Sequence, residues 1–345
     1  MELRLLSADD VTRALPMSEA IEAVKIAYAQ VSAGRVDLPL RTRIDVPEYQ
    51  GAALFMPAYL GSSGDLAVKI VSVFPRNVAQ GIPTIAAVVI VLDARTGRPV
   101  ALVEGASLTA IRTGAASGVA TDVLAREDSK RLAVFGSGAQ ARTQLQAVCT
   151  VRTIEHVRIF SLEAEASKEM VADMAGRDPI PADVTVAASP AEAIADADII
   201  CTATTSDTPV FDGAGLKPGT HINAIGSYTP AMQEVDVTTI QRALVVVDSI
   251  AAVLAETGDL LVPIGRGEIT ADIIHAELGQ VINGDRSGRT MNSGALFIRL
   301  SRFPAVGSTP EPFSGPWLPG ALLRLVARPG AHDVRPAARS TGRLL

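Results

Sequence analysis

Cysteine is scarce in this chain of 345 residues, which contains only Cys149 and Cys201. Each lies in an apolar stretch, so a disulfide framework or a cysteine metal site is excluded and both thiols are expected to be reduced and buried. The four histidines are scattered without the spacing of metal ligands, so no metal site is predicted. The N-terminus lacks the features of a secretory signal, which together with the reduced thiols predicts a cytoplasmic protein.

Surplus basic charge and long apolar runs are also missing. The 31 Lys and Arg residues are outnumbered by 37 Asp and Glu residues, and the resulting net charge of −6 argues against a nucleic-acid partner, which requires a basic face. The longest apolar runs, such as residues 85–92, are far too short to cross a membrane, so no membrane partner is expected. The 48% of hydrophobic residues and the length instead favour a compact globular enzyme of two domains.

Residues 1–118 are predicted to form an α+β domain. Ser7 heads a polar turn before an apolar helical rhythm that continues to about residue 34, which predicts a pair of helices. Between residues 38 and 103 the pattern shortens to strands separated by turn residues, which predicts an antiparallel sheet. Small residues with a helical period over 108–125 predict a close-packed helix that leads into the next domain.

Residues 119–289 alternate strand-like and helix-like segments, which is typical of a parallel sheet covered by helices. Six segments have the apolar content of strands: residues 131–136, 157–161, 184–188, 197–204, 221–226 and 243–248. An α/β fold with a doubly wound Rossmann sheet is therefore predicted. Residues 290–345 contain so many prolines that neither period persists, and a mostly irregular tail is predicted there.

A glycine turn follows the first of these strands, in the stretch RLAVFGSGAQARTQL. Gly136, Gly138 and Ala141 match the G-x-G-x-x-G/A fingerprint, in which small residues permit the turn, the approach of a pyrophosphate and the packing of helix on strand. The phosphates would lie over the free N–H groups of the helix N-terminus. The alternative is a turn used only for packing. The residues predicted to contact a dinucleotide here are Gly136, Ser137, Gly138, Ala139 and Gln140.

The residue at the end of the second strand bears on the choice of nicotinamide cofactor. A sheet that binds NAD usually has Asp or Glu there, and this chain has Ser161. A small hydroxyl leaves room for a 2′-phosphate, which Arg142 could meet with a charge-assisted hydrogen bond. NADP(H) is therefore predicted as the preferred cofactor, with NAD(H) as the alternative. Two other interpretations stay open: Arg142 as a solvated first-turn residue, and Glu163 as a partner of the ribose hydroxyls.

Several stretches together resemble the ornithine cyclodeaminase/mu-crystallin family, over roughly residues 1–290. They are PLRTRI (39–44), LFMPAYL (54–60), LAVKIVSVFP (66–75), GIPTIAA (81–87), TAIRTGAASG (109–118), FGSGAQAR (135–142), CTATTS (201–206) and HINAIGSYTP (221–230). The resemblance implies an N-terminal substrate-binding and dimerisation domain to which the end of the chain returns, a Rossmann domain, a homodimer, and a small imino- or amino-acid substrate held between the domains.

The same resemblance assigns roles to basic side chains. Arg41 matches the residue that binds the substrate carboxylate, and Arg112, with Thr113 beside it, matches a residue that binds this carboxylate or the cofactor pyrophosphate. A planar guanidinium suits either anion because it makes two parallel hydrogen bonds. Lys69 matches the family's active-site lysine, and burial in its apolar strand would lower its pKa. An edge-strand lysine that reaches solvent is the alternative, and Arg43 is a second candidate for the carboxylate.

Threonines complete the predicted cofactor site. Thr84 matches a family position near the nicotinamide. Thr202 and Thr204 end the fourth strand of the predicted Rossmann sheet, at the edge where open parallel sheets bind ligands. Strand-start or loop-capping hydroxyls are the alternative for all three.

One departure from the family bears on the reaction. Cyclodeaminases carry an aspartate and a lysine in a GGDCPGK stretch, where this chain reads GSYTPAM with Tyr228 and Met232. Cyclodeamination needs a base, and tyrosine, with a pKa of about 10, is a poor one at neutral pH. The sequence therefore favours an NAD(P)-dependent oxidoreductase that reduces a small cyclic imino acid such as pyrroline-2-carboxylate. An alanine-type dehydrogenase, an ornithine cyclodeaminase and a non-catalytic NADP-dependent binding protein of the mu-crystallin type remain alternatives.

Overall fold

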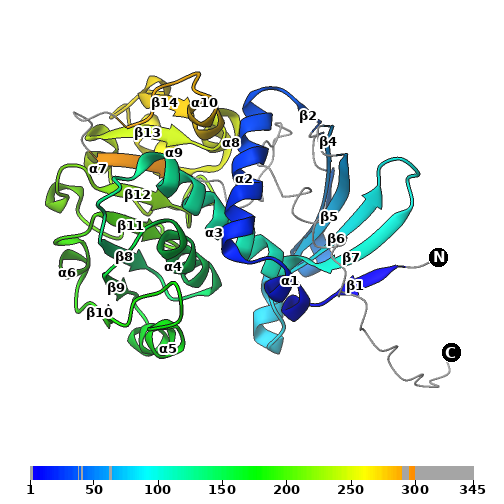
Figure 1. The fold of residues 1–345 in the computed structure, drawn as a ribbon, viewed down its shortest axis with the longest axis horizontal. Helices are drawn as coiled ribbons and strands as arrows, with labels where there is room; N and C mark the ends of the chain where they lie inside the picture. Colours follow the sequence, from blue (N-terminus) through cyan, green and yellow to red (C-terminus); the bar gives the residue numbers. More distant parts are fainter. Residues whose placement is uncertain (1–2, 38, 40–41, 62–63, 290–294, 300–345) are drawn as a thin grey trace.

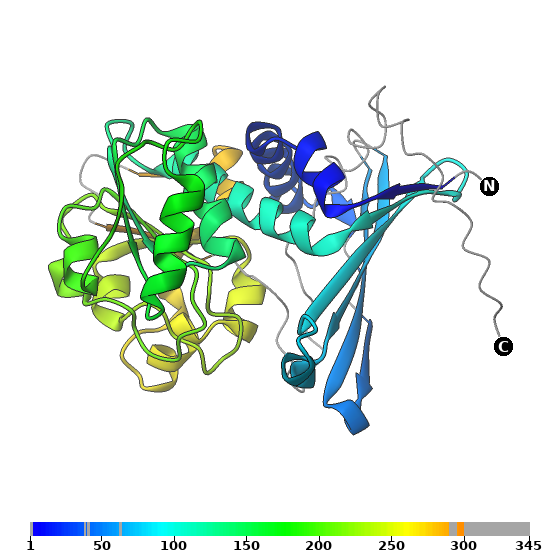
Figure 2. The ribbon, with the colours of Figure 1, turned by 90° about the horizontal axis from the view of Figure 1, so that it is seen from below.

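The described part of the molecule contains two β-sheets that are joined by one long helix, with further helices packed around them (Figure 1). This computed structural model describes residues 3–37, 39, 42–61, 64–289 and 295–299. Figure 1 places α2 and α3 between the two sheets, and Figure 2 shows α3 running from the first sheet into the second with the two N-terminal helices beside it. None of the described helices is long and apolar enough to span a lipid bilayer.

The predicted pair of helices follows a short strand near the N-terminus. The first, α1 (Ala8–Ala14), begins at a reciprocal cap, in which the Ser7 hydroxyl accepts the N–H of Asp10 at 3.3 Å and the Asp10 carboxylate accepts the N–H of Ser7 at 3.0 Å. The second, α2 (Met17–Ser32), ends just before Gly34, whose φ of 67° lies in the region that favours glycine.

The first sheet is mainly antiparallel. Its strands follow the order β1 (Arg4–Leu6), β7 (Pro99–Glu104), β6 (Ile85–Asp93), β5 (Asp65–Val73), β4 (Gly51–Leu60) and β2 (Val36–Asp37). The strand β3 (Thr42–Val46) also pairs with β4. Two short 3-10 helices, η1 (Pro47–Tyr49) and η2 (Pro75–Gln80), lie between strands. The antiparallel prediction is confirmed for β4 to β7, whereas β1 was not predicted and pairs in parallel with β7.

The second sheet contains eight parallel strands in the described residues. Their order is β10 (Val184–Val186), β9 (His156–Phe160), β8 (Arg131–Phe135), β11 (Ile199–Thr202), β12 (His221–Ala224), β15 (Ala295–Arg299), β13 (Ala243–Val247) and β14 (Ile274–Glu277). All six predicted strands are present, and the predicted fold class is confirmed. Successive residues of β11 enter different cores, since Ile199 and Cys201 pack with α4 while Ile200 packs with α6. Helices therefore cover both faces of this sheet.

The helices of the second half are mostly short. They are α4 (Ala139–Val151), α5 (Ala164–Met174), α6 (Pro190–Ile194), α7 (Val237–Gln241), α8 (Ile250–Glu256), α9 (Gly258–Gly265) and α10 (Leu278–Ile282), with 3-10 helices η3 (Gly213–Gly215) and η4 (Ala271–Ile273).

Residues 295–299, inside the tail that was predicted to be mostly irregular, form a strand. They form neither irregular structure nor a return to the first sheet, because β15 is inserted between β12 and β13 and runs parallel to both. Phe297 and Ile298 are fully buried, in two different cores. This short apolar segment forms a strand because β12 and β13 supply hydrogen-bond partners for its backbone on both sides. The prolines later in the tail do not interfere with this pairing. The remaining positions of the tail, 290–294 and 300–345, lie outside the described residues.

The helix α3 (Gly105–Leu124) contains the domain boundary that was predicted between residues 118 and 119. Small residues let it approach its neighbours: a Cβ on Gly118 would lie 2.6 Å from Cδ1 of Ile21 in α2, and a Cβ on Gly114 would lie 2.6 Å from the carbonyl oxygen of Thr143 in α4. One hydrophobic core includes Val89 of the first sheet, side chains of α3 and Val246 of the second sheet. The helix thus belongs to the core of both halves.

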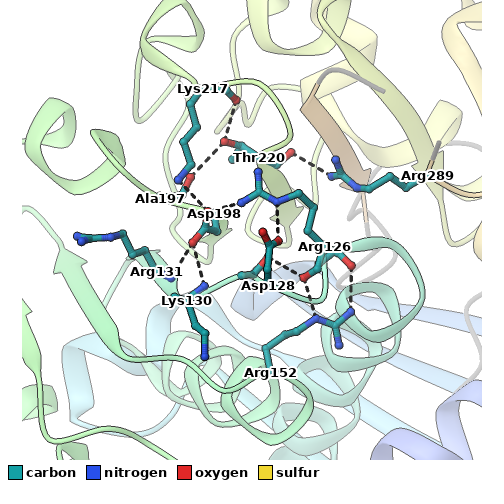
Figure 3. A network of polar contacts seen from close by, with 12 residues as sticks. Arg126, Asp128, Lys130, Arg131, Arg152, Ala197, Asp198, Lys217, Thr220 and Arg289 are labelled. Atoms are coloured by element: carbon teal, nitrogen blue, oxygen red, sulfur yellow. Dashed lines mark hydrogen bonds and ion pairs between the residues drawn. The ribbon is translucent and has the colours of Figure 1, made fainter. Parts of the chain in front are cut away.

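A polar network at the amino-terminal edge of the second sheet holds the end of α3 in place (Figure 3). The carboxylate of Asp198, just before β11, accepts hydrogen bonds from Arg126 at 2.6 Å and Lys217 at 2.8 Å, and from the N–H groups of Lys130 and Arg131 at 2.9 and 3.0 Å. This one buried carboxylate therefore joins the starts of β8 and β11 to the segment that follows α3.

Two arginines in the same network satisfy the last carbonyl groups of α3 (Figure 3). The Nη2 group of Arg152 donates to Thr121 at 2.9 Å and to Asp122 at 3.0 Å, and Nε of Arg289 donates to Leu124 at 2.7 Å. A helix C-terminus leaves carbonyl groups without partners and carries partial negative charge, so cationic donors stabilise it.

Candidate active site

Lys69 lies in the middle of β5, on the face of the sheet that packs against α3. Residues two apart on a strand share a face, and Ala67, Lys69 and Val71 are all buried. Only 4% of the Lys69 surface is exposed, and β5 is flanked by β4 and β6, so the structure rules out an edge-strand lysine. The Nζ of Lys69 donates a hydrogen bond to the hydroxyl of Thr109 on α3, at 2.7 Å.

The electrostatic surroundings of Lys69 disfavour its charged form. Burial lowers the pKa of Lys69 well below its usual 10.5, and the nearby charge of Arg112 lowers it further. Burial also lowers the pKa of Arg112, while Tyr28 and Asp248 oppose this shift, and a guanidinium stays charged in proteins. Lys69 of β5 and Arg112 of α3 thus form a pair of basic groups, which suits an anionic ligand such as a carboxylate.

Thr113 connects this part of α3 to the helix that follows the glycine turn. Its hydroxyl donates to the carbonyl of Thr109 at 2.7 Å, and its carbonyl accepts a hydrogen bond from the side chain of Gln144 in α4 at 3.3 Å. The predicted residues Lys69, Arg112 and Thr113 are thus brought together along α3, beside the N-terminal half of α4.

The glycine turn lies between β8 and α4, as the fingerprint predicts. Gly136 has a φ of 105°, and a Cβ there would lie 2.7 Å from the carbonyl oxygen of Ala203, so glycine is required. A Cβ on Gly138 would meet nothing within 4 Å, and this residue begins α4 without a side-chain cap. The first N–H groups of α4 therefore remain available to a phosphate.

Two residues after the turn also fit a bound dinucleotide. Ala139 is exposed at the start of α4. Gln140 is buried, and its side-chain oxygen finds no hydrogen-bond donor among the described residues. The turn and the open helix N-terminus together suit the pyrophosphate of a dinucleotide.

Ser161 directly follows β9 and lies beside the glycine turn. The Ser137 hydroxyl donates to the Ser161 oxygen at 3.3 Å, and Ser161 in turn accepts the N–H of Glu163 at 3.0 Å. Arg142 is not simply solvated, because its guanidinium forms an ion pair with Asp173 of α5 at 2.8 Å. Glu163 is exposed at the start of α5. A hydroxyl therefore occupies the position at the end of β9.

Thr202 and Thr204 lie at the carboxyl edge of the sheet, but their hydroxyls contact a buried glutamate. Glu234 accepts hydrogen bonds from the Thr202 hydroxyl at 2.8 Å, from the Thr204 hydroxyl at 2.7 Å and from the N–H of Gly226 at 2.5 Å. Its own N–H donates to Asp259 at 2.6 Å. Glu234 was not predicted, because a single loop glutamate has no spacing signal and only the pairing of β11 with β12 brings it to Thr202.

The contacts of the other predicted residues are local or lie outside the described residues. Thr84 immediately precedes β6, and its carbonyl accepts the N–H of Phe74 at 2.8 Å. Arg43 on β3 forms an ion pair with Asp45 at 2.5 Å. Arg41 lies outside the described residues.

Comparison with known proteins identifies the family of this chain. Residues 1–297 match the family described as Ornithine cyclodeaminase/mu-crystallin family. The chain is a member of this family. The expected resemblance is thereby confirmed.

Two kinds of enzyme in the family are similar to the chain over most of its length. Delta(1)-pyrroline-2-carboxylate reductase of Bacillus cereus is 43% identical over 289 residues, which are 83% of this chain and 87% of that protein. The solved Thermococcus litoralis Delta(1)-pyrroline-2-carboxylate reductase, in complex with NADH and L-proline, is 38% identical with a TM-score of 0.83, covering 94% and 96% of the two chains. An archaeal alanine dehydrogenase dimer with bound NAD is 30% identical with a TM-score of 0.81, covering 94% and 95%.

The loop after β12 contains Tyr228 and Met232. The Ser227 hydroxyl donates to the carbonyl of Met232 at 2.7 Å, and the N–H of Met232 donates to the carbonyl of Thr229 at 3.1 Å, so the loop is closed on itself. Tyr228 and Met232 supply no carboxylate and no amine. The part of the chain that the structure describes also contains no cluster of His, Cys, Asp and Glu that could hold a metal ion.

Proposed function

We propose that this protein is an NAD(P)H-dependent reductase that converts a small cyclic imino acid, such as pyrroline-2-carboxylate, into the corresponding amino acid. The observation that carries the proposal is the buried contact of Lys69 with α3, next to Arg112 and close to the helix that follows the glycine turn. The similar reductases, one of them solved with NADH and L-proline, support the same substrate class.

The side chains on α3 and β5 are suited to this reaction. The dinucleotide, when bound, supplies the hydride that adds to the carbon of the C=N bond. Arg112 binds the substrate carboxylate or the pyrophosphate, with Arg41 as the second cation for the carboxylate. Lys69 gives a proton to the imine nitrogen, and its lowered pKa makes its ammonium form a stronger acid than that of an exposed lysine. One hydride and one proton convert the imine to the amine, so the step balances.

The remaining proposed contacts are with the cofactor. The glycine turn and α4 receive the pyrophosphate, and Thr113 lies beside Arg112. Thr84, Thr202 and Thr204 line the nicotinamide side of the site, where Glu234 orients the hydroxyls of the last two.

NADP(H) is the cofactor that we propose to be preferred, with NAD(H) as the alternative. Ser161 leaves space at the end of β9 and adds no negative charge against a 2′-phosphate. Arg142 can reach such a phosphate only by leaving Asp173, so this ion pair weakens the preference. The solved relatives with bound NADH or NAD support a nicotinamide dinucleotide in general.

A homodimer is supported by the outer face of the first sheet. Phe55, Pro57, Val68, Ile70 and Ile90 are partly exposed there on three neighbouring paired strands. A contiguous apolar surface of this kind usually marks an interface. A second copy of the chain is the partner that we propose, since the similar archaeal alanine dehydrogenase is a dimer. Light scattering should give twice the chain mass, and Val68→Asp should give the monomer.

The two cysteines support a reducing compartment, which we propose to be the cytoplasm. Both are free and buried. Burial raises the pKa of Cys149 to about 12 and that of Cys201 to about 12, so neither thiol forms a reactive thiolate at neutral pH.

Absorbance of NADPH in the presence of pyrroline-2-carboxylate tests the proposed reaction. Turnover is expected, with a loss of roughly 100-fold in kcat for Lys69→Ala. Lys25→Ala, which removes a partly exposed lysine paired with Asp122, is the control and should keep full activity. Turnover of pyruvate and ammonia alone would favour an alanine dehydrogenase. Binding of NADPH without turnover of any imino or amino acid would contradict the enzyme and favour a binding protein.

A further inference from the structure

We propose that Thr109 is a positioning residue for Lys69, whose amine it holds in the direction needed to deliver a proton to the substrate. This inference rests on the proposed function, in which Lys69 is the proton donor. Thr109 lies 40 residues from Lys69 in the sequence, and both side chains are almost completely buried.

The hydrogen bonds of Thr109 leave its hydroxyl only one way to contact the lysine. The Thr109 hydroxyl donates to the carbonyl of Gly105 at 2.6 Å, so its single hydrogen is already used. Its oxygen therefore accepts a hydrogen from Nζ of Lys69, at 2.7 Å. One N–H of the amine points at Thr109 in both protonation states, and this contact fixes the directions of the other hydrogens or of the lone pair.

The start of α3 is rigid, which makes the hydroxyl a stable reference point. A Cβ on Gly105 would lie 2.7 Å from the backbone of Ala87, so the first turn of α3 rests directly on β6. The carboxylate of Glu104 caps the helix by accepting the N–H of Ala106 at 2.7 Å and that of Ser107 at 2.9 Å. Thr109 is one turn further along this anchored helix.

The neighbours of Lys69 on the described strands β4 and β6, which are Met56 and Val89, carry no charge. The charged group that acts on Lys69 from α3 is Arg112. An acceptor oxygen favours the ammonium over the neutral amine, so Thr109 opposes the effects of burial and of Arg112.

Three variants test the inference. Thr109→Val keeps the shape and removes the acceptor, and Thr109→Ser keeps the acceptor. Thr121→Val removes a buried hydroxyl further along the same helix, where Thr121 accepts a hydrogen bond from Asn223 at 3.0 Å. Thermal unfolding of all three separates loss of fold from loss of positioning.

Thr109→Val should lower kcat about 10-fold with a smaller change in KM, and should move the basic limb of the pH profile of kcat to lower pH. Thr109→Ser should stay close to the wild type in both respects. Thr121→Val should be less stable without a shift of the pH profile. A folded Thr109→Val enzyme with wild-type kcat and pH profile would overturn the inference, as would equal damage in Thr109→Ser.

A measurement without substrate keeps this inference separate from the proposed function. In protein labelled with 15N-lysine, the Nζ resonance of Lys69, assigned by its loss in Lys69→Ala, can be followed against pH. Titration at lower pH in Thr109→Val than in the wild type supports positioning even if no imino acid is reduced. Identical titration of the two proteins would overturn it even if the reductase activity is found.

Discussion

Thr204 directs both its N–H and its hydroxyl to one carboxylate oxygen of Glu234, at 2.6 and 2.7 Å. The other oxygen of Glu234 accepts the Thr202 hydroxyl and the N–H of Gly226. A single buried carboxylate thus ties the ends of β11 and β12 together, at the edge where parallel sheets bind ligands.

Replacement of this carboxylate is expected to weaken cofactor binding. In Glu234→Gln the amide NH₂ replaces an acceptor with a donor, so at least one buried donor loses its partner at a cost of about 3 kcal/mol in the free energy of unfolding. The KM for NADPH should rise several-fold more than the KM for the imino acid. Steady-state kinetics and urea unfolding measure both effects. Glu165→Gln, at an exposed site, is the control, and an unchanged KM for NADPH in Glu234→Gln would contradict this role.

Cofactor preference should respond to charge at the end of β9. A carboxylate in Ser161→Asp repels a 2′-phosphate and accepts the ribose hydroxyls of NADH, so the ratio of kcat/KM for NADPH over NADH should fall about 10- to 100-fold. Leu162→Asp adds the same charge on the next side chain, which is 96% exposed, and should change the ratio little. If both variants behave alike, Ser161 does not face the ribose.

Acid should destabilise the protein through His221. Its ring is fully buried with Nε2 3.1 Å from the Asn223 oxygen, and burial lowers its pKa from 6.5 to about 3. Because the folded-state pKa is depressed, the stabilisation is present above pH 6.5 and is lost as the pH falls toward 3. Between pH 7.5 and 4.5 the loss should be about 2–3 kcal/mol.

Urea unfolding at several pH values measures this dependence. His221→Gln should show a smaller loss over the same range, whereas His275→Gln, at a partly exposed site, should follow the wild type. An equally steep pH dependence in His221→Gln would assign the effect to other groups.

Asp198 is a second acid-sensitive group, whose stabilising effect on the end of α3 is lost only below pH 3.8. Burial by itself would raise the pKa of Asp198, but hydrogen bonds from Lys217 and from the N–H groups of Lys130 and Arg131 outweigh burial and hold the pKa below 3.8. Asp198→Asn should therefore lower the free energy of unfolding at pH 7 by about 2 kcal/mol. The difference from the wild type should shrink below pH 3.8, as the native carboxyl takes up its proton.

The matched control for this network is Asp128→Asn. Asp128 contacts the same Arg126 at 3.0 Å, but its side chain is 80% exposed, so its loss should cost little because water replaces the contact. Equal effects of the two substitutions would show that burial of Asp198 adds nothing.

Local patterns predicted most of the fold. The spacing of apolar residues located the strands from β4 to β13. The glycine turn was predictable because position 136 requires a positive φ and leaves no space for a Cβ, and only glycine meets both conditions. β15 was missed because the few apolar residues at 295–299 have no local sign of a strand. Their conformation depends on β12 and β13, which pair with them on both sides.

By itself, the sequence determined the strands from β4 to β13, the helices up to α6, the phosphate-binding turn and the presence of a lysine in an apolar strand, because backbone preference and burial periodicity are local properties. Tertiary structure alone decided which distant groups meet: Thr109 with Lys69, Glu234 with Thr202, and Arg142 with Asp173. These contacts follow from the order of strands and the approach of α3 to both sheets. No spacing along the chain encodes them, because each joins residues that only the packing of separate elements brings together.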